Sequence, residues 1–116
     1  MLDINQYQEN VVSYNDYPKE LGPYYSVMGI MAVTGTLAEK VQALLHTQDG
    51  KIDKRYAMKM AISLGDILRY ISCMAADLNM GMDEIMSINL KKLEMERQKK
   101  MEEQKTIISE NDVKNK

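Results

Sequence analysis

Asp66 is the residue of this sequence whose type and position most clearly suggest chemistry. It lies within the stretch 57–79, where its short charged side chain interrupts a mostly apolar pattern. Such a carboxylate caps a neighbouring group, pairs with a cation or binds a ligand. A half-exposed Asp paired with a nearby Lys or Arg is an equal alternative on composition. Lys59, Ser63 and Tyr70 share helical spacing with Asp66 and predict a polar line bordering the core.

The stretch that carries Asp66 is predicted to be an amphipathic helix. Its apolar residues follow one another at alternating spacings of four and three, which places them on one face of an α-helix. We expect this face to pack as one continuous stripe. The stripe consists of Met60, Leu64, Ile67, Ile71, Met74 and Leu78.

Two helices are predicted before this stretch. Asp3 or Asn5 is expected to cap a short first helix that runs to about Tyr14. The segment 15–23 contains two prolines and a glycine and predicts a loop. A long second helix is expected over 24–46. Because it is apolar on several faces, we expect it to pack both within its own domain and against another copy of the chain.

The connections predict how the remaining helices follow. The polar turn 47–53 is short, which favours antiparallel packing of the second and third helices, and Asp53 is expected to cap the third. Gly81 breaks the helical pattern, and a fourth helix restarts with Asp83 near its N-terminus. The charged segment after it is expected to be a solvated helical extension that frays into disorder near Ser109. No strand pattern is visible, so the predicted class is all-α.

Composition restricts the class of protein further. The chain has 116 residues and a net charge of -2, which favours one compact domain and argues against a nucleic-acid partner. We expect a helical domain over 1–93 and a charged extension over 94–116. A single cysteine, Cys73, cannot form an internal disulfide and suggests a reducing compartment. No apolar run approaches membrane-spanning length, and no signal peptide is visible, so the predicted location is cytoplasmic.

Four short motifs occur in order along residues 4–93. They are Tyr-Gln near the start, Gly-x-Leu-Ala-Glu-Lys-Val on the second helix, Leu-Gly-Asp-x-Leu-x-Tyr on the third and Asn-x-x-Lys-Leu on the fourth. Together they resemble a MazG-type all-α nucleoside triphosphate pyrophosphohydrolase. This resemblance implies a four-helix bundle that forms dimers or tetramers. The excess of apolar surface on the second and third helices favours a homodimer as well.

The resemblance also implies a reaction. In that family, Glu-x-x-Glu on the second helix and Glu-x-x-Asp on the third hold magnesium. Residues three apart lie on the same helix face, so each pair can converge on one ion cluster. The cations neutralise the triphosphate and orient a water molecule, which yields a nucleoside monophosphate and pyrophosphate.

This chain departs from the family pattern at the metal site. Val33 and Thr36 stand where the two glutamates of the second helix are expected, and Ser63 stands at the glutamate position of the third. Only Asp66 remains. One carboxylate and two hydroxyls are a poor cage for Mg²⁺, so we expect magnesium binding to be weak or absent. Glu39, one turn beyond, is either a replacement ligand or a solvated surface residue.

The phosphate-binding end is partly retained. By resemblance, Lys40, Asn89 and Lys92 match residues that approach substrate phosphates, and Tyr70 is a candidate for stacking on a base. Ordinary surface lysines and a core-edge tyrosine are equally good interpretations of these residues.

Three functional hypotheses follow. The favoured one is a MazG-like protein that has lost most or all magnesium-dependent hydrolysis and binds a nucleoside triphosphate, another phosphate-bearing small molecule, or a partner. The alternative is an active pyrophosphohydrolase rebuilt around Asp66 and Glu39. The third is a helical adaptor that binds a partner through the segment 94–116.

Overall fold

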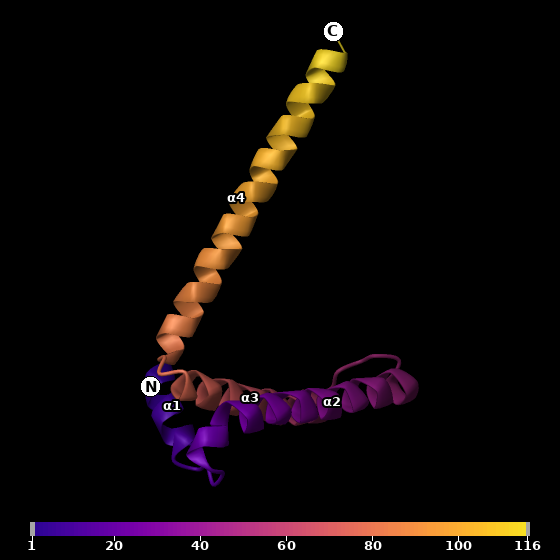
Figure 1. Ribbon diagram of the computed structural model, residues 1–116. Helices are drawn as coiled ribbons and strands as arrows, with labels where there is room; N and C mark the ends of the chain where they lie inside the picture. Colours follow the sequence, from indigo (N-terminus) through magenta and orange to yellow (C-terminus); the bar gives the residue numbers. More distant parts are fainter. Residues whose placement is uncertain (1, 116) are drawn as a thin grey trace. The chain divides into compact units, whose positions relative to one another are not determined.

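The computed structural model describes residues 2–115, and the regular structure within this range is entirely helical (Figure 1). Four α-helices are present, with no strand among residues 2–115, which confirms the all-α class. The elements are α1 (Ile4–Val12), a short 3₁₀ helix (Lys19–Leu21), α2 (Gly22–Gln48), α3 (Lys54–Asp77) and α4 (Met82–Lys114).

The predicted helix caps are confirmed at two helices. The carboxylate of Asp3 accepts from the backbone N–H of Gln6 at 2.8 Å, and the Gln6 side chain accepts from the Asp3 N–H at 3.1 Å. This reciprocal capping box satisfies two donors at the end of α1. Asp53 caps α3 by accepting from the Tyr56 N–H at 2.9 Å. These short-range bonds set where both helices begin.

The second helix is longer than predicted at both ends. It begins at Gly22, so Pro23 belongs to its first turn rather than to the preceding loop, and it ends at Gln48 rather than near His46. Proline is tolerated in a first turn because the N–H groups there have no partner within the helix.

The two later helices also differ from the predicted bounds. α3 ends at Asp77, since Asn79 adopts a left-handed conformation with φ 59° that cannot continue the helix. α4 continues to Lys114, past Ser109, where charge alternation predicted fraying.

The chain divides into two compact units, which we describe separately. The first extends to Met82 and contains α1, α2 and α3; the second begins at Asp83 and contains nearly all of α4. Within the first unit, α2 and α3 form a hairpin in which they lie side by side, and α1 packs on α3 (Figure 1). The boundary between the units precedes position 93, where the sequence predicted the end of the helical domain.

The contact between α2 and α3, which we call the seam, uses residues at alternating spacings of four and three on both helices. All of them are buried or half-buried. The seam consists of Ser26, Ile30, Val33, Leu37, Lys40 and Leu44 on α2 and of Tyr56, Met60, Ser63, Ile67, Tyr70 and Met74 on α3.

The predicted apolar stripe of α3 is therefore not continuous. Leu64 is 57% exposed and Leu78 is 51% exposed, although Met60, Ile67, Ile71 and Met74 are half-buried. The physical reason is that α3 contacts α2 through two polar residues, Ser63 and Tyr70. In this orientation of α3, Leu64 points away from α2. Conversely, two members of the predicted polar line, Lys59 and Asp66, are exposed.

The hairpin has two further faces with different chemistry. Successive residues of an α-helix are rotated by about 100°. In an antiparallel pair, the residues that follow the seam positions on both helices therefore point to the same side. This side, the uncharged face, consists of Val27, Met31, Thr34, Ala38, Val41 and Leu45 on α2 and of Ala57, Ala61, Leu64, Leu68, Ile71 and Ala75 on α3.

The opposite side, which we call the polar face, is formed by the residues that precede the seam positions. Its charged members are Glu39, Arg55, Lys59, Asp66 and Arg69, and its hydroxyl members are Tyr25 and Thr36. The candidate site residues of the first unit therefore lie either on this face or in the seam beside it.

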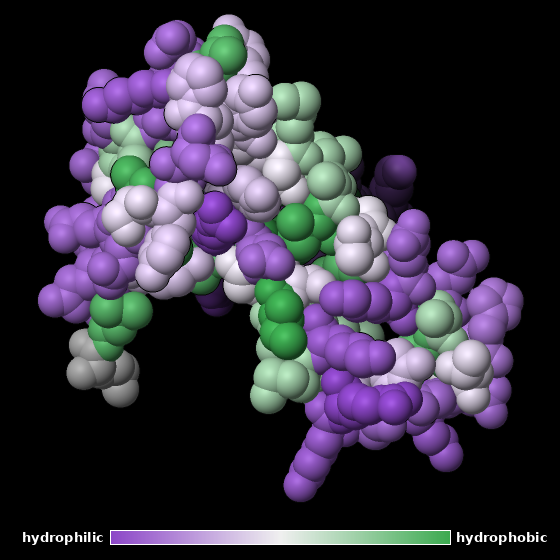
Figure 2. All heavy atoms as spheres, turned by 90° about the horizontal axis from the view of Figure 1, so that it is seen from below, coloured by the Kyte–Doolittle hydropathy of each residue, from purple (hydrophilic) through white to green (hydrophobic). Residues whose placement is uncertain are grey.

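The buried core is small for a chain of this composition. Among the described residues, the buried hydrophobic side chains are Val11, Leu44, Cys73, Ala75 and Met82. Cys73 is 1% exposed, and its Sγ lies 3.4 Å from Oδ1 of Asn15. Many large apolar residues remain exposed instead. Figure 2 shows such residues on the surface, interspersed with hydrophilic ones.

Candidate functional site

A fixed ammonium group lies at the edge of the seam. Lys40 donates from Nζ to Oγ of Ser63 at 2.8 Å and to the backbone carbonyl of Lys59 at 3.4 Å. Ser63 is only 3% exposed, so this lysine reaches from α2 to a buried hydroxyl on α3. An ammonium group has three donors, and these two bonds leave one N–H for another acceptor.

Three more cations lie on the polar face, each beside an aromatic ring. Cζ of Arg55 lies 5.7 Å from the ring centre of Tyr56. Nζ of Lys59 lies 5.4 Å from the ring centre of Tyr56, and Cζ of Arg69 lies 5.4 Å from that of Tyr70. Cations at this distance from an aromatic ring are attracted by its quadrupole. The Nε of Arg69 is buried and has no hydrogen-bond partner within residues 2–115.

The two candidate catalytic carboxylates, Asp66 and Glu39, are both exposed. Asp66 lies close enough to α1 to influence Tyr7, whose hydroxyl donates to the Gly65 carbonyl at 3.4 Å. Burial raises the pKa of Tyr7, and the charge of Asp66 adds to that rise. The equal alternative of Asp66 paired with a basic residue receives no support, since no ion pair joins it to a lysine or arginine within residues 2–115.

The three positions where the resemblance expects glutamates have distinct surroundings. Val33 is half-buried in the seam, and Ser63 is buried against Lys40. The hydroxyl of Thr36 donates to the carbonyl of Ala32 at 3.2 Å. Among residues 2–115, no group of three or more His, Cys, Asp or Glu side chains could hold a metal ion.

Tyr70 has a packing role in the seam. Its ring lies against Gly29 so closely that a Cβ added there would be 2.6 Å from the ring atoms. The missing side chain of Gly29 therefore makes room for the ring. This contact covers part of Tyr70 and limits the ring surface that is open to a base.

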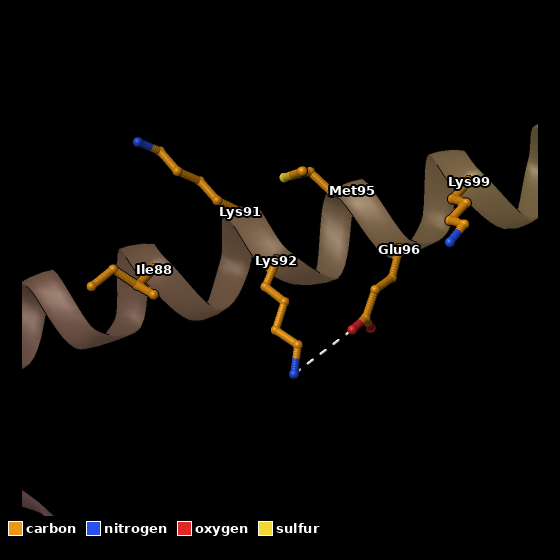
Figure 3. A pocket seen from close by; sticks show the side chains of 6 residues that line it. All are labelled: Ile88, Lys91, Lys92, Met95, Glu96 and Lys99. Carbon is orange, nitrogen blue, oxygen red and sulfur yellow. Dashed lines mark ion pairs between the residues drawn. The ribbon is translucent and has the colours of Figure 1, made fainter.

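Asn89 and Lys92 belong to the second unit. Both are exposed on α4, and Lys92 forms an ion pair with Glu96 at 3.7 Å. Lys92 also borders a shallow hollow of about 570 Å³, all of whose lining residues come from this one helix (Figure 3). The structure thus brings Lys40 together with Ser63, and it describes Asn89 and Lys92 only with α4.

Gln8 belongs to the Tyr-Gln motif near the start of the chain, but the sequence did not predict that its amide is buried. It is 7% exposed, and its Nε2 donates to the carbonyls of Ser72 at 3.1 Å and Met80 at 2.9 Å. Its Oε1 accepts from the N–H of Met82 at 3.1 Å. Gln8 therefore ties α1 to the end of α3 and to the first residue of α4. Because all of its partners are distant backbone groups, local spacing could not predict these hydrogen bonds.

No protein-family profile matches the chain, and no solved structure matches it. The chain is similar to the Gene 37 protein of Mycobacterium phage L5, with 30% identity over 73 residues. That similarity covers 63% of this chain and 64% of the phage protein, so the chain spans less than two thirds of that relative. Among the described residues, no helix has the length and apolarity needed to cross a membrane.

Proposed function

We propose that this chain is a MazG-like helical protein that has lost most or all magnesium-dependent triphosphate hydrolysis. It binds a nucleoside triphosphate, another phosphate-bearing small molecule, or a partner. Its location is the cytoplasm, and it forms a homodimer or a tetramer. The order of the four helices and the position of the retained motifs on α2, α3 and α4 support the relationship.

The observation that carries this proposal is the bond of 2.8 Å between Nζ of Lys40 and Oγ of Ser63. The resemblance places a metal-binding glutamate at position 63. In this chain the same position holds a buried hydroxyl, and an ammonium group lies against it. A fixed positive charge there repels Mg²⁺ and attracts an anion.

The surroundings of Lys40 favour a phosphate. Arg55, Lys59 and Arg69 add three cations to the polar face, whereas Glu39 and Asp66 supply two carboxylates. Together with Lys40 these six groups carry a net charge of +2. The remaining N–H of Lys40 offers a charge-assisted hydrogen bond to a phosphate oxygen, which is stronger than a neutral one.

The test is calorimetric binding of a panel of canonical nucleoside triphosphates to the full chain in the presence of EDTA. Lys40→Met removes the fixed ammonium group, and Lys19→Met, an exposed lysine outside the hairpin, is the matched control. We expect metal-free binding by the wild type and the control. The Lys40 variant should bind at least about tenfold more weakly, since one charge-assisted bond is worth about 1.5–3 kcal/mol.

Two results would overturn the proposed site. One is equal affinity of the Lys40 variant and the wild type. The other is binding that occurs only when Mg²⁺ is added.

The alternative of an active pyrophosphohydrolase has one observation in its favour, which is that Asp66 and Glu39 both lie exposed on the polar face. Pyrophosphate release from canonical and modified nucleoside triphosphates, with Mg²⁺ or Mn²⁺, tests it. Turnover that disappears in Asp66→Ala but persists in Asp16→Ala would establish the enzyme in place of the binding protein.

A further inference from the structure

We infer that the phosphate site at Lys40 extends along the first two turns of α3 to Lys59 and Arg55, and that it binds an unbranched polyphosphate chain without reading a base. The ligand class is any compound with two or more linked phosphates, with or without a nucleoside. This inference rests on the proposed function, because Lys40 belongs to both, and it specifies which phosphate-bearing molecules the chain binds.

Three cations lie in a short row at this end of the hairpin. Nζ of Lys40 donates to the backbone carbonyl of Lys59 at 3.4 Å, so Lys40 lies at the level of Lys59. Nζ of Lys59 and Cζ of Arg55 lie 5.4 Å and 5.7 Å from the ring centre of Tyr56. These two charges are therefore at most about 11 Å apart, which is the sum of the two distances. Arg55 and Lys59 are separated by about one helical turn, so the row follows the axis of α3.

The row keeps an excess of positive charge. Among residues 2–115, no ion pair involves Lys40, Lys59 or Arg55. The carboxylate of Asp53 is nearby; its pKa is lowered chiefly by its capping hydrogen bond, with a smaller effect from the charge of Arg55. Glu39, next to Lys40 in the chain, is exposed. Three cations thus accompany two carboxylates, and a bound anion would relieve the repulsion among the cations.

The position of these cations is unfavourable for the stability of α3. Arg55 lies in its first turn and Lys59 in its second, and the first turn contains no acidic residue. The N-terminal end of a helix carries partial positive charge, so cations there are repelled by the helix dipole. Local arrangements that lower stability in this way are typical of functional sites. The dipole itself adds to the attraction of an anion.

The aromatic rings beside these cations favour a phosphate chain over a base. The ring of Tyr56 already lies beside both Arg55 and Lys59, and the ring of Tyr70 packs against Gly29. Bases of nucleotides and single strands are bound by stacking on open aromatic faces. The contacts that remain for a ligand are charges, and linked phosphates present negative charge at successive points along a chain. A monophosphate could reach only part of the row.

The test is calorimetric binding to the full chain in the presence of EDTA. Mono-, di- and triphosphates of one nucleoside measure the effect of chain length, and triphosphates of the four canonical nucleosides measure base selectivity. Inorganic tripolyphosphate and a single-stranded oligonucleotide complete the set. We expect affinity to rise severalfold with each phosphate and to differ less than about threefold among bases, with tripolyphosphate bound as tightly as a nucleoside triphosphate.

Arg55→Gln and Lys59→Gln remove the two added cations. Lys54→Gln is the matched control, because it removes a charge from the same turn of α3 on another side of the helix. Each of the two variants should bind tripolyphosphate about threefold to fivefold more weakly, as expected for exposed charge pairs, and the control should not. Affinity for the monophosphate should stay unchanged in all three. A structural role would lower the melting temperature, whereas the helix dipole predicts an unchanged or higher one.

The outcomes separate this inference from the proposed function. Wild-type affinity in the Arg55 and Lys59 variants, together with a loss in Lys40→Met, would keep the proposed site and refute its extension. Selectivity among bases above about tenfold, or tripolyphosphate that fails to bind where a nucleoside triphosphate binds, would also refute it. An oligonucleotide bound more tightly than tripolyphosphate would establish a nucleic-acid site instead. If the wild type binds none of these compounds, both proposals are wrong.

Discussion

Two residues of α2, Gly29 and Lys40, determine how closely and with what chemistry α2 approaches α3. Gly29 leaves space for the ring of Tyr70, and Lys40 brings a charge to the buried hydroxyl of Ser63. Contacts between packed helices are usually apolar. At the Gly29–Tyr70 and Lys40–Ser63 contacts, this seam has less apolar contact than usual. The polar residues of the seam therefore both pack α2 against α3 and belong to the candidate site.

The fit of Gly29 to Tyr70 can be tested by substitution. A methyl group in Gly29→Ala would force the ring to move, and we expect a loss of about 1–3 kcal/mol in the free energy of unfolding. Gly35→Ala is the control, because a Cβ there meets nothing within 4 Å. In a helix that change should stabilise by about 0.5–1 kcal/mol. Urea unfolding measures both; a Gly29 variant as stable as the wild type would show that the ring does not need this space.

Some of this residue-level detail was within reach of the sequence. Helical spacing marked Ser63, Asp66 and Tyr70 as neighbours on one helix. It did not show that Lys40, more than 20 positions earlier, reaches Ser63. That pairing depends on the register of α2 against α3, which the local spacing of either helix leaves open.

At the scale of elements, the helix ends follow local chemistry. Asp53 accepts from the N–H of Tyr56, and the left-handed residues Asp49 and Gly50, with φ 52° and 79°, turn the chain between α2 and α3. Gly50 suits this conformation because it has no Cβ. Caps of this kind form between residues close in sequence, which explains why Asp53 was predicted correctly and why Asp3 was one of the two caps expected for α1.

The Asp53 cap should make α3 sensitive to acid. The hydrogen bond from the Tyr56 N–H lowers the pKa of the Asp53 carboxyl below its ordinary value of 3.8. A carboxyl whose folded-state pKa is lowered stabilises the fold above the unfolded pKa, and this contribution is lost as pH falls through the folded pKa. Thermal melts from pH 7 to pH 2 should therefore show a smaller acid-induced loss for Asp53→Ala than for the wild type.

Asp53→Asn is the matched control for this prediction. Asparagine caps a helix about as well as aspartate but does not titrate in this range. It should keep the neutral-pH stability that Asp53→Ala loses. If both variants melt at the wild-type temperature at neutral pH, the cap contributes nothing measurable.

At the scale of the whole molecule, the folded chain should not depend on metal. In a site with four carboxylates, mutual repulsion raises their pKa values or loosens the helices when the ion is absent. Val33, Thr36 and Ser63 carry no charge at the corresponding positions, so this chain has no such repulsion to relieve.

We therefore expect millimolar Mg²⁺ to leave the melting temperature unchanged relative to EDTA at matched ionic strength, because a ligand stabilises only the state that it binds. Differential scanning calorimetry on the full chain is the measurement. A rise of several degrees with Mg²⁺ would contradict the proposal that the metal site has been lost.

The sequence by itself determined the all-α class, the order of four helices and the Asp53 cap, and it narrowed the first cap to Asp3 or Asn5. These features follow from period, cap chemistry and composition, all of which act over a few residues. Only the tertiary structure decided which residues form the seam, where Gln8 places its amide and that Lys40 meets Ser63. Each of these features depends on how one helix is rotated against another. The apolar pattern is compatible with several rotations, and polar contacts between residues far apart in the sequence select one of them.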